Sequence, residues 1–365
     1  MRRLFFLAFV LGLPGLAQCQ ARTVRIGVLG IFHPRVLALS ADQAGELVVS
    51  ASHEDLFLRP RSACSLAVIR SISSELHLRC GDKEIVATEM RVAGRNQQSA
   101  PLLISVPGTL KRRYEGVLDL KSKNGELVAV VTMDLETAVA SAVQAEAAPD
   151  TPLEALKAQA VVSRSYFVAG AGRHTDFDFC DLTHCQVLRD PPAAGSPAQQ
   201  ATDATRGVVL TYQGKPFAAM FTPSCGGRTR TPQEIGLPQN GYPYFSVLCD
   251  YCHRNPIRWT RKVSREDAAL LILRGENGRL EVGRRLGWDA VPSNNFTARE
   301  ENGEVILEGI GRGHGLGLCE RGARDMAEGG SDHRAILDHY YPNTKLQELD
   351  AGGQVSTPGG QDHNQ

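Results

Sequence analysis

Residues 135–169 contain two helical segments joined by a short turn, and the other motifs are arranged around them. The first segment, 135–146, is rich in alanine and spaces its leucine and valine residues as an α-helix does. The second follows Thr151-Pro152, where a hydroxyl N-cap, a proline and a glutamate three places after the threonine predict a capping box. Gly170 predicts its end. The sequence therefore predicts a helical hairpin with Glu146 at its elbow.

The second predicted helix has one apolar face and one charged face. The apolar positions recur at helical spacing and predict contact with the core; they are Leu153, Leu156, Ala160, Ser163 and Phe167. On an adjacent face, Lys157 and Arg164 lie seven positions apart, so their side chains are expected to project together.

Strand signals dominate the sequence before this hairpin. Residues 22–113 contain short β-forming runs broken by Gly, Pro, Ser and Asn. Residues 114–133 alternate around Asn124-Gly125, a turn signal for a β-hairpin. The predicted fold class is α+β: a helical hairpin packed on antiparallel β segments, with a β-rich amino-terminal region. The predicted domains are an accessory β-rich region at 22–113 and a second domain at 114–349.

Weaker signals follow the helical hairpin. Residues 191–201 are rich in Pro, Ala and Gln and predict a linker, and residues 264–274 predict a capped helix. A last helix is expected at 331–341, because Pro342 would stop it. The polar residues 350–365, rich in Gly and Gln, are expected to form a disordered tail.

Residues 1–21 predict export. Two arginines, an apolar run and small residues before a cleavage site are typical of a secretory signal peptide. Lipoprotein cleavage before Cys19 is the alternative. Later residues contain no apolar stretch of the length that a transmembrane helix needs. The mature chain is therefore expected to be secreted or periplasmic, in the cell envelope, and either soluble or anchored at its start.

The overall charge restricts the class of partner. The chain has 40 basic and 40 acidic residues, so its formal net charge is zero. This balance argues against nucleic acid, and against an anionic membrane surface, as a partner held by bulk charge. It does not exclude a sugar substrate.

Nine cysteines in a chain expected to be exported predict disulfides. Cys64 and Cys80 are the expected pair in the amino-terminal region. Cys225, Cys249 and Cys252 are expected to contain a disulfide rather than a redox centre, because no thioredoxin-like βαβ pattern surrounds them.

The loop after the second helix concentrates side chains that bind metals. It offers two imidazoles and two thiols, from His174, Cys180, His184 and Cys185. This is the ligand set of a closed tetrahedral zinc site, which leaves no position for water, so zinc there would be structural. The alternative is a disulfide between Cys180 and Cys185 with two surface histidines.

Four motifs occur in a fixed order along residues 114–344. They are Glu146-x-x-Pro149 followed by EALKAQAVVSRSY, then RHTDFDFCDLTHCQ, SCGGRT and GRGHGLGLCERGA. Together they resemble the stage II sporulation protein D (SpoIID/LytB) family, and the ordered set is far more specific than one motif. The resemblance implies a peptidoglycan lytic transglycosylase acting on glycan strands, or a relative that assists a cell-wall amidase.

The motifs also predict roles for individual residues. Glu146 matches the family's catalytic acid/base. Lys157 and Arg164 are expected to hold substrate, because an arginine fork suits a carboxylate. Ser224 and His314 lie in the glycine-rich motifs and are expected to contact sugar. Some family members bind zinc in the segment that contains the His/Cys loop, which favours a structural zinc in the domain at 114–349.

The sequence departs from the family pattern in two places. Glu146-Ala-Ala-Pro stands where the family usually has Glu-Met-Pro, so the apolar support beside the acid is smaller. Cys319-Glu320 stands where the family usually has Ser-Gln. Glu320 adds a second carboxylate and raises the hypothesis of a two-carboxylate hydrolase.

Three functions are compatible with these features. The predicted one is cleavage of peptidoglycan by lytic transglycosylation, with Glu146 as general acid/base and 1,6-anhydromuramyl products. The second is a non-catalytic wall-binding module that stimulates an N-acetylmuramoyl-L-alanine amidase. The third is a zinc hydrolase in which water replaces one of the four loop ligands.

Overall fold

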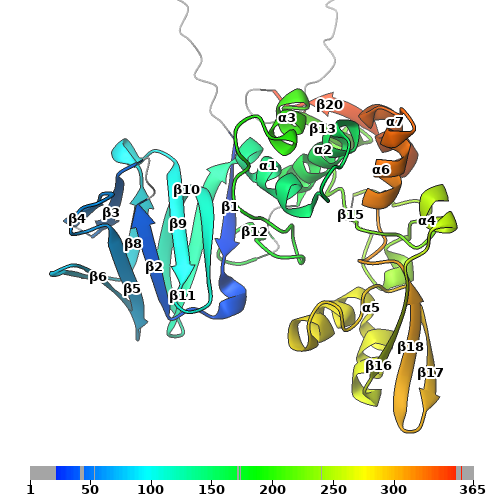
Figure 1. The fold of residues 1–365 in the computed structure, drawn as a ribbon, viewed down its shortest axis with the longest axis horizontal. Helices are drawn as coiled ribbons and strands as arrows, with labels where there is room; N and C mark the ends of the chain where they lie inside the picture. Colours follow the sequence, from blue (N-terminus) through cyan, green and yellow to red (C-terminus); the bar gives the residue numbers. More distant parts are fainter. Residues whose placement is uncertain are drawn as a thin grey trace, which may run out of the picture.

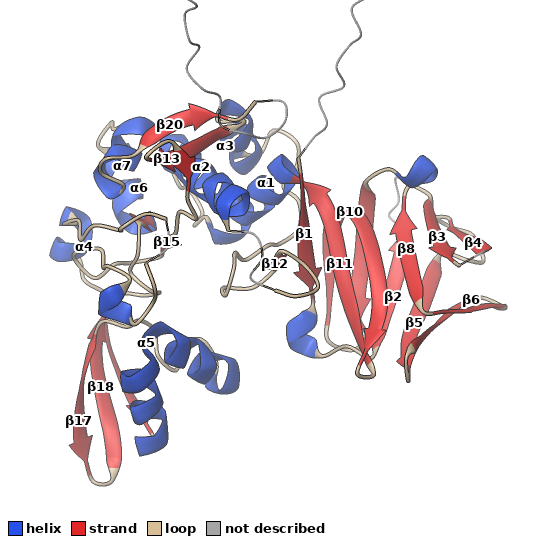
Figure 2. Ribbon diagram, turned by 180° about the vertical axis from the view of Figure 1, so that it is seen from behind, coloured by secondary structure: helices blue, strands red, loops and turns tan. Residues whose placement is uncertain are grey.

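The structure, a computed structural model, describes residues 22–41, 45–52, 54–170, 172, 174–239, 241–350 and 355. Figure 1 shows a curled sheet, a central group of helices, and an arm in which one helix lies beside three strands. Figure 2 shows the same three parts from behind. The predicted signal peptide, Cys19 and most of the predicted tail lie outside the described residues. No helix in the described part of the chain is both long enough and apolar enough to cross a membrane.

The amino-terminal part is a 12-stranded sheet, antiparallel except where β12 (Phe179–Cys180) pairs with β1. Side chains alternate between buried and exposed along strands such as β7 and β8, and the buried ones form one large core. Its other strands are β1 (Thr23–Val28), β2 (Val36–Ala41), β3 (Leu47–Ala51), β4 (Glu54–Leu58), β5 (Leu66–Ile72), β6 (Glu75–Cys80), β7 (Lys83–Ala87), β8 (Glu89–Ala93), β9 (Ala100–Val106), β10 (Leu110–Lys123) and β11 (Glu126–Asp134). The predicted α+β class is confirmed, and so is its β-rich amino-terminal region.

The predicted β-hairpin forms from β10 and β11. Lys123 pairs with Glu126 across the turn, and Asn124 and Gly125 both have positive φ angles, 56° and 78°. Such a turn matches the twist of the two strands. β10 also pairs with β8 and β9, and β11 continues the sheet to Asp134. The boundary predicted between residues 113 and 114 therefore falls inside β10.

The expected disulfide between Cys64 and Cys80 is present. It joins the last residue of β6 to the segment before β5. A covalent link of this kind restricts the unfolded chain, and so it stabilises the amino-terminal sheet.

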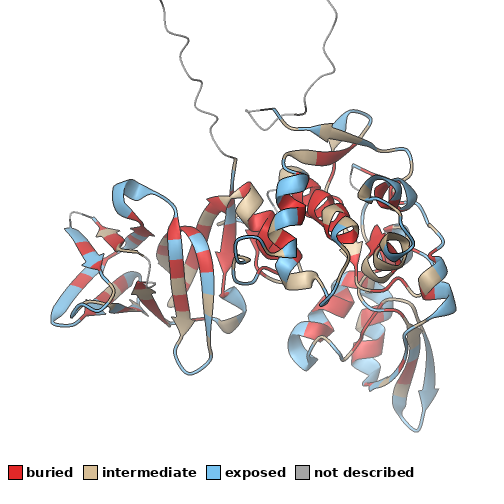
Figure 3. Cartoon of the chain, turned by 45° about the horizontal axis from the view of Figure 1, so that its top comes forward, coloured by how far each residue is buried: buried red, intermediate tan, exposed pale blue. Residues whose placement is uncertain are grey.

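The predicted helical hairpin forms as α1 (Leu135–Glu146) and α2 (Leu153–Ala169). Asp134 caps α1, because its carboxylate accepts the N–H groups of Glu136 and Thr137 at 2.9 and 3.2 Å. Gly170 ends α2 as predicted. Figure 3 shows the central helices coloured mainly as buried, and the apolar face predicted for α2 lies in the core except for Leu153.

The capping box predicted at the start of α2 is wrong. Pro152 occupies the N-cap position, which therefore has no side-chain cap. The hydroxyl of Thr151 donates instead to the carbonyl oxygen of Ala148 at 2.7 Å, inside the turn. The carboxylate of Glu154 is engaged by another helix, as described below.

A buried ion pair fastens α2 to α1. The Arg164 side chain is fully buried, and its Nε and Nη2 donate to the two carboxylate oxygens of Glu136 at 2.8 and 2.6 Å. The same guanidinium donates to the carbonyl oxygens of Thr202 and Val208 at 3.3 and 3.0 Å. A buried charge is tolerated when it is paired and hydrogen-bonded in this way.

Short helices and two small sheets surround the hairpin. β13 (Val208–Tyr212) pairs with β14 (Lys215–Pro216) and β20 (Lys345–Glu348), and β15 (Phe221–Thr222) pairs with β19 (Leu318–Cys319). The helices are α3 (Pro197–Ala204), α4 (Asp250–Arg254), α6 (Glu320–Glu328) and α7 (His333–Tyr340). Helix α7 confirms the last predicted helix.

The linker predicted at 191–201 is wrong over its second half, which begins α3. Ser196 caps this helix by accepting the Gln199 N–H at 3.3 Å, and Pro197 occupies its first position. These are ordinary helix-start signals, and the surrounding Pro and Ala residues obscured them.

The arm consists of α5 (Arg265–Leu286) beside an antiparallel sheet of β16 (Arg258–Val263), β17 (Phe296–Glu301) and β18 (Glu304–Ile310). Ser264 caps α5 by accepting the Asp267 N–H at 3.0 Å, as predicted. The helix is longer than the predicted 264–274 because it continues past a break at Gly275. That residue has a φ of 50°, and a Cβ there would overlap the carbonyl oxygen of Ile235.

Replacing Arg164 with alanine is expected to lower the free energy of unfolding by about 3–5 kcal/mol, because Glu136 and two carbonyl oxygens lose their buried donor. Urea denaturation followed by circular dichroism measures this loss. Lys157→Ala on the same helix is the matched control, and a loss of about 0–1 kcal/mol is expected for its partly exposed ion pair. Similar losses in the two variants would contradict the structural role of Arg164.

Candidate functional site

Glu146 is the last residue of α1 and lines two adjoining pockets of about 520 and 360 Å³. The helix ends here because Ala147 has an extended backbone and Pro149 follows two residues later. Burial raises the pKa of Glu146, and a hydrogen bond from the Val187 N–H and the charge of Arg189 oppose this only in part. Its carboxyl group therefore holds a proton at a higher pH than an exposed glutamate does.

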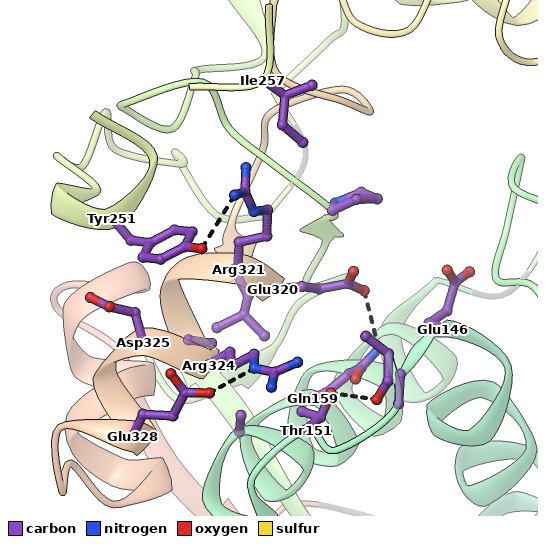
Figure 4. A pocket seen from close by; sticks show the side chains of 16 residues that line it. Glu146, Thr151, Gln159, Tyr251, Ile257, Glu320, Arg321, Arg324, Asp325 and Glu328 are labelled. Carbon is purple, nitrogen blue, oxygen red and sulfur yellow. Dashed lines mark hydrogen bonds and ion pairs between the residues drawn. The ribbon is translucent and has the colours of Figure 1, made fainter. Parts of the chain in front are cut away.

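Glu320 lies in the larger pocket with Glu146. It is the first residue of α6, and its carboxylate accepts the Gln159 Nε2–H at 3.2 Å. Figure 4 shows both carboxyl groups at the same cavity, from helices far apart in the sequence. Burial, and after it the charge of Glu146, raises the pKa of Glu320 well above its ordinary value.

The wall of the larger pocket opposite Glu146 carries charges of both signs: Arg321 and Arg324 lie with Asp325 and Glu328, and Arg324 donates to Glu328 at 2.7 Å. Arg321 lies over the ring of Tyr251, 4.8 Å from its centroid, and donates to the Tyr251 hydroxyl at 3.3 Å. Arg324 donates to the carbonyl oxygen of Pro149 at 3.3 Å. Sequence reasoning missed Gln159, Tyr251, Arg321 and Arg324. The helix that follows the Gly-His-Gly motif was the available signal, because residues 320, 321 and 324 lie within one turn of each other.

His314 lines the smaller pocket together with Glu146. Gly313 and Gly315 have φ angles of 87° and 82°, which glycine adopts readily. Burial lowers the pKa of His314 to about 4, so its imidazole is neutral at neutral pH. The Leu316 N–H donates to Nδ1 at 3.0 Å, which leaves the ring proton on Nε2.

An ion pair forms a buried part of the smaller pocket. The Nε and Nη2 of Arg279 donate to the two carboxylate oxygens of Glu276 at 2.7 and 2.6 Å. Asn294 also donates to Glu276. Burial acts to raise the pKa of Glu276, but the hydrogen bond and charge of Arg279 together with the hydrogen bond from Asn294 outweigh it, and the pKa is lowered. Glu276 therefore stays ionised beside His314.

Three residues predicted to hold substrate lie away from both pockets. Arg164 is fully buried in its ion pair with Glu136, so the prediction that it contacts substrate is corrected. Lys157 donates to Glu154 at 2.6 Å. Ser224 is buried, with its hydroxyl 3.5 Å from the sulfur of Cys252. The sequence placed them on the correct elements but could not show which face the tertiary structure would cover.

The four residues predicted as metal ligands come together. Their ligand atoms lie within 4.8 Å of one another, and they are His174, Cys180, His184 and Cys185. The sulfur of Cys185 lies 3.3 Å from His174 Nε2 and 3.5 Å from His184 Nδ1. A nitrogen ligand about 2.0 Å and a sulfur ligand about 2.3 Å from the same tetrahedral ion would be about 3.5 Å apart. This cluster can therefore hold a metal.

The sheet holds the His/Cys loop in place. Asp181 is buried and accepts hydrogen bonds from Arg112 and Tyr114 of β10 at 2.8 and 3.0 Å. Asp176 forms ion pairs with Lys121 and Lys123 of the same strand. The proposed ligands are therefore presented by a loop tied to β10 and, through β12, to β1.

The fold and these clusters define a mixed α+β protein whose cleft presents two carboxyl groups beside a loop rich in thiols and imidazoles. The family model described as "Stage II sporulation protein" matches residues 123–212. This range includes α1, α2 and the His/Cys loop. The resemblance to the SpoIID/LytB family predicted from the sequence motifs is confirmed by this match and by similar curated proteins.

Several curated proteins are similar to this chain. An uncharacterized protein of Brachyspira hyodysenteriae is 29% identical over 262 residues, which are 62% of this chain and 70% of that protein. Stage II sporulation protein D of Bacillus amyloliquefaciens is 25% identical over 269 residues, 61% of this chain and 76% of that protein. The amidase enhancer of Bacillus subtilis is 24% identical over 276 residues, 53% of this chain and 38% of that protein.

Glu154 joins α2 to α7. It accepts the backbone N–H of His333 at 2.9 Å, lies 2.8 Å from His333 Nδ1, and accepts from Lys157. Burial acts to raise the pKa of Glu154, but the hydrogen bonds from Lys157 and His333 outweigh it and lower the pKa from 4.5 to about 2. A carboxylate with a lowered pKa stabilises the fold above the unfolded pKa, and this stabilisation is lost as pH falls through the folded pKa.

The Glu154→Gln variant is expected to be less stable than the wild type by about 1–2 kcal/mol at pH 6, after allowance for solvent screening of a partly exposed group. The difference should shrink between pH 4.5 and pH 2. Urea denaturation at a series of pH values measures it, with the exposed Glu115→Gln of β10 as control. A difference independent of pH would exclude an ionic role for Glu154.

Proposed function

We propose that this protein cleaves the glycan strands of peptidoglycan by lytic transglycosylation, with Glu146 as the acid/base. The observation that carries the proposal is the position of Glu146, a partly buried carboxyl group with a raised pKa that is shared by two adjoining pockets. A strand bound across both pockets would have sugars on each side of this carboxyl group. The names of two relatives, stage II sporulation protein D and amidase enhancer, support a role at the bacterial cell wall.

In this reaction Glu146 acts twice. In its protonated form it gives a proton to the glycosidic oxygen while the bond from that oxygen to the anomeric carbon breaks. The resulting carboxylate then takes the proton of the same sugar's 6-hydroxyl, whose oxygen bonds to the anomeric carbon. The product is a 1,6-anhydro end, and no water is consumed. The pKa of Glu146 suits the first step, because burial favours its protonated form.

Glu320 distinguishes this cleft from that of a hydrolase in which one carboxyl group is protonated and the second is an ionised base or nucleophile. Its pKa is raised even more clearly than that of Glu146, so it is expected to remain neutral and to act as a hydrogen-bond donor to substrate. If Glu320 instead became ionised and activated a water molecule, the product would have a reducing end. The stereochemistry and the end group of the product therefore report its role.

Substrate contacts are assigned to the residues that line the pockets. Arg321 lines the larger pocket and suits an anionic group such as the lactyl carboxylate of N-acetylmuramic acid, whereas Arg324 already donates to Glu328. The ring of Tyr251 offers an apolar face to a sugar. In the smaller pocket, His314 lies beside Glu146, and its ring is held by hydrogen bonds with the Phe221 and Leu316 backbone, so its role would be to shape the sugar site.

The His/Cys cluster is proposed to hold a structural zinc ion. Two imidazoles and two thiolates fill a tetrahedral shell, so the ion would fix the loop that carries His184 and Gln186 against the smaller pocket. It would supply folding free energy and no catalytic water.

A non-catalytic role is the second candidate. The amidase enhancer of Bacillus subtilis is similar to this chain, and its name describes assistance to an amidase. In that case the cleft would bind glycan without cleaving it and would bring a partner N-acetylmuramoyl-L-alanine amidase to the wall.

The Glu146→Gln variant is expected to lower the rate of glycan cleavage by at least about 10²-fold, because glutamine cannot transfer the proton. Mass spectrometry of products from intact and peptide-stripped peptidoglycan measures this, with Glu115→Gln as control. Anhydromuramyl ends from the wild type and the control, but not from Glu146→Gln, are expected. Reducing ends would support hydrolysis. Binding without cleavage, with stimulation of an added amidase, would support the second candidate.

The His184→Ala variant is expected to lose zinc at the loop and to lower the melting temperature by more than about 5 °C, because the metal contributes folding free energy. Elemental analysis and differential scanning calorimetry measure the two effects. Loss of activity with an unchanged melting temperature would favour a catalytic zinc instead. Zinc binding also requires that Cys180 and Cys185 are thiols and do not form a disulfide. Thiol alkylation of the same samples checks this.

A further inference from the structure

Four buried cysteines meet at a second cluster, behind the wall of the larger pocket. Their sulfur atoms lie within 4.8 Å of one another, and the residues are Cys225, Cys249, Cys252 and Cys319. They come from the turn after β15, from the start of α4 and from the end of β19. The disulfide predicted among the first three is absent, since all four are thiols in the structure.

The spacing of these sulfurs is that of ligands around one small ion. The sulfurs of Cys252 and Cys319 are 3.5 Å apart. Four sulfurs at about 2.3 Å from a tetrahedral zinc ion are about 3.8 Å apart, whereas two sulfurs in a disulfide are about 2.05 Å apart. The four sulfurs lie no more than 4.8 Å from one another. This separation fits a single ion, but it is too short for an iron–sulfur cluster that contains its own sulfides.

Hydrogen-bond donors surround the sulfurs. The backbone N–H of Cys225 donates to Cys319 Sγ at 3.4 Å, and the Tyr340 hydroxyl donates to Cys249 Sγ at 3.4 Å. The Ser224 hydroxyl lies 3.5 Å from Cys252 Sγ. Four thiolates around a divalent ion carry a net charge of −2, and such donors stabilise that buried charge. A thiol alone does not need them.

Helix α6 packs closely against the cluster. A Cβ added at Gly322 of α6 would lie 2.6 Å from Cys249 Sγ and would overlap the Tyr340 hydroxyl. Glycine therefore allows α6 to approach the cluster closely. This helix begins directly after Cys319, so its position depends on the same group of sulfurs.

We propose that these four cysteines form a second, tetrathiolate zinc site that is structural. Binding releases the thiol protons to solvent and transfers no electrons, so it needs no oxidant or reductant. The site joins three segments that are far apart in the sequence. Cys319 immediately precedes Glu320, and Cys249 and Cys252 flank Tyr251, so the ion fixes two residues of the larger pocket relative to each other. The inference does not depend on the reaction proposed for the pocket.

The first test counts zinc in the purified full chain and in two single variants. The Cys252→Ser variant is expected to contain one equivalent fewer than the wild type, and so is His184→Ala. The variant that carries both substitutions should contain two equivalents of zinc fewer than the wild type, because the clusters share no ligand. Equal zinc content in the wild type and in a folded Cys252→Ser variant would overturn the proposal.

The second test uses the wild type, so it does not require a variant to fold. Protein unfolded without a reductant is alkylated and digested, and each cysteine is scored as labelled or disulfide-bonded by mass spectrometry. All four cysteines of the cluster should be labelled, whereas Cys64 and Cys80 should remain linked as the internal control. In the native state, the four should become reactive only after a chelator is added. Disulfides among these four cysteines in the native preparation would overturn the proposal.

Cobalt substitution adds a spectroscopic measurement. Co²⁺ replaces Zn²⁺ in thiolate sites, and a tetrathiolate ion gives stronger sulfur-to-metal charge transfer than an ion with two imidazole ligands. The charge-transfer absorbance of the His184→Ala protein is therefore expected to exceed half that of the wild type. Complete loss of the absorbance in His184→Ala would contradict the second site.

Discussion

The buried pairing of Arg164 with Glu136 is the interaction on which the centre of the molecule depends. It joins the first turn of α1 to α2 and adds the carbonyl oxygens of Thr202 and Val208 to the same guanidinium. A buried charge must keep all these partners, so the helices have little freedom to slide. Glu146, at the end of α1, is thereby held in a fixed position at the edge of the cleft.

The cleft is assembled from segments that lie far apart in the sequence. Glu146 ends α1, the helix that follows the sheet directly, whereas Glu320 and Arg321 begin a helix after the arm. Hydrophobic packing brings these segments together, and the four cysteines of the second cluster are part of that core. Ions bound by the two clusters would add a further constraint on the same segments.

The electrostatics of the cleft follow from its shape. Burial raises the pKa of both Glu146 and Glu320, and the charge of Glu146 adds to the effect on Glu320, so both retain protons more strongly than exposed glutamates do. His314 is affected in the opposite direction, because burial disfavours its cationic form. The cleft thus offers carboxyl groups that hold their protons to higher pH than exposed ones, and an imidazole that is neutral at neutral pH. Neutral groups make hydrogen bonds without the desolvation penalty of a buried charge.

The sequence alone determined the local structure: the Asn124-Gly125 hairpin, the helices α1 and α2, the Cys64–Cys80 pair and the grouping of the His/Cys ligands. These depend on short-range backbone preferences and on ligands close together in the chain. The tertiary structure alone decided that Arg164 is buried, that Glu320 and Arg321 share a pocket with Glu146, and that Cys319 joins Cys225, Cys249 and Cys252. Burial and contacts between distant segments depend on how the elements pack, and no local pattern encodes that packing.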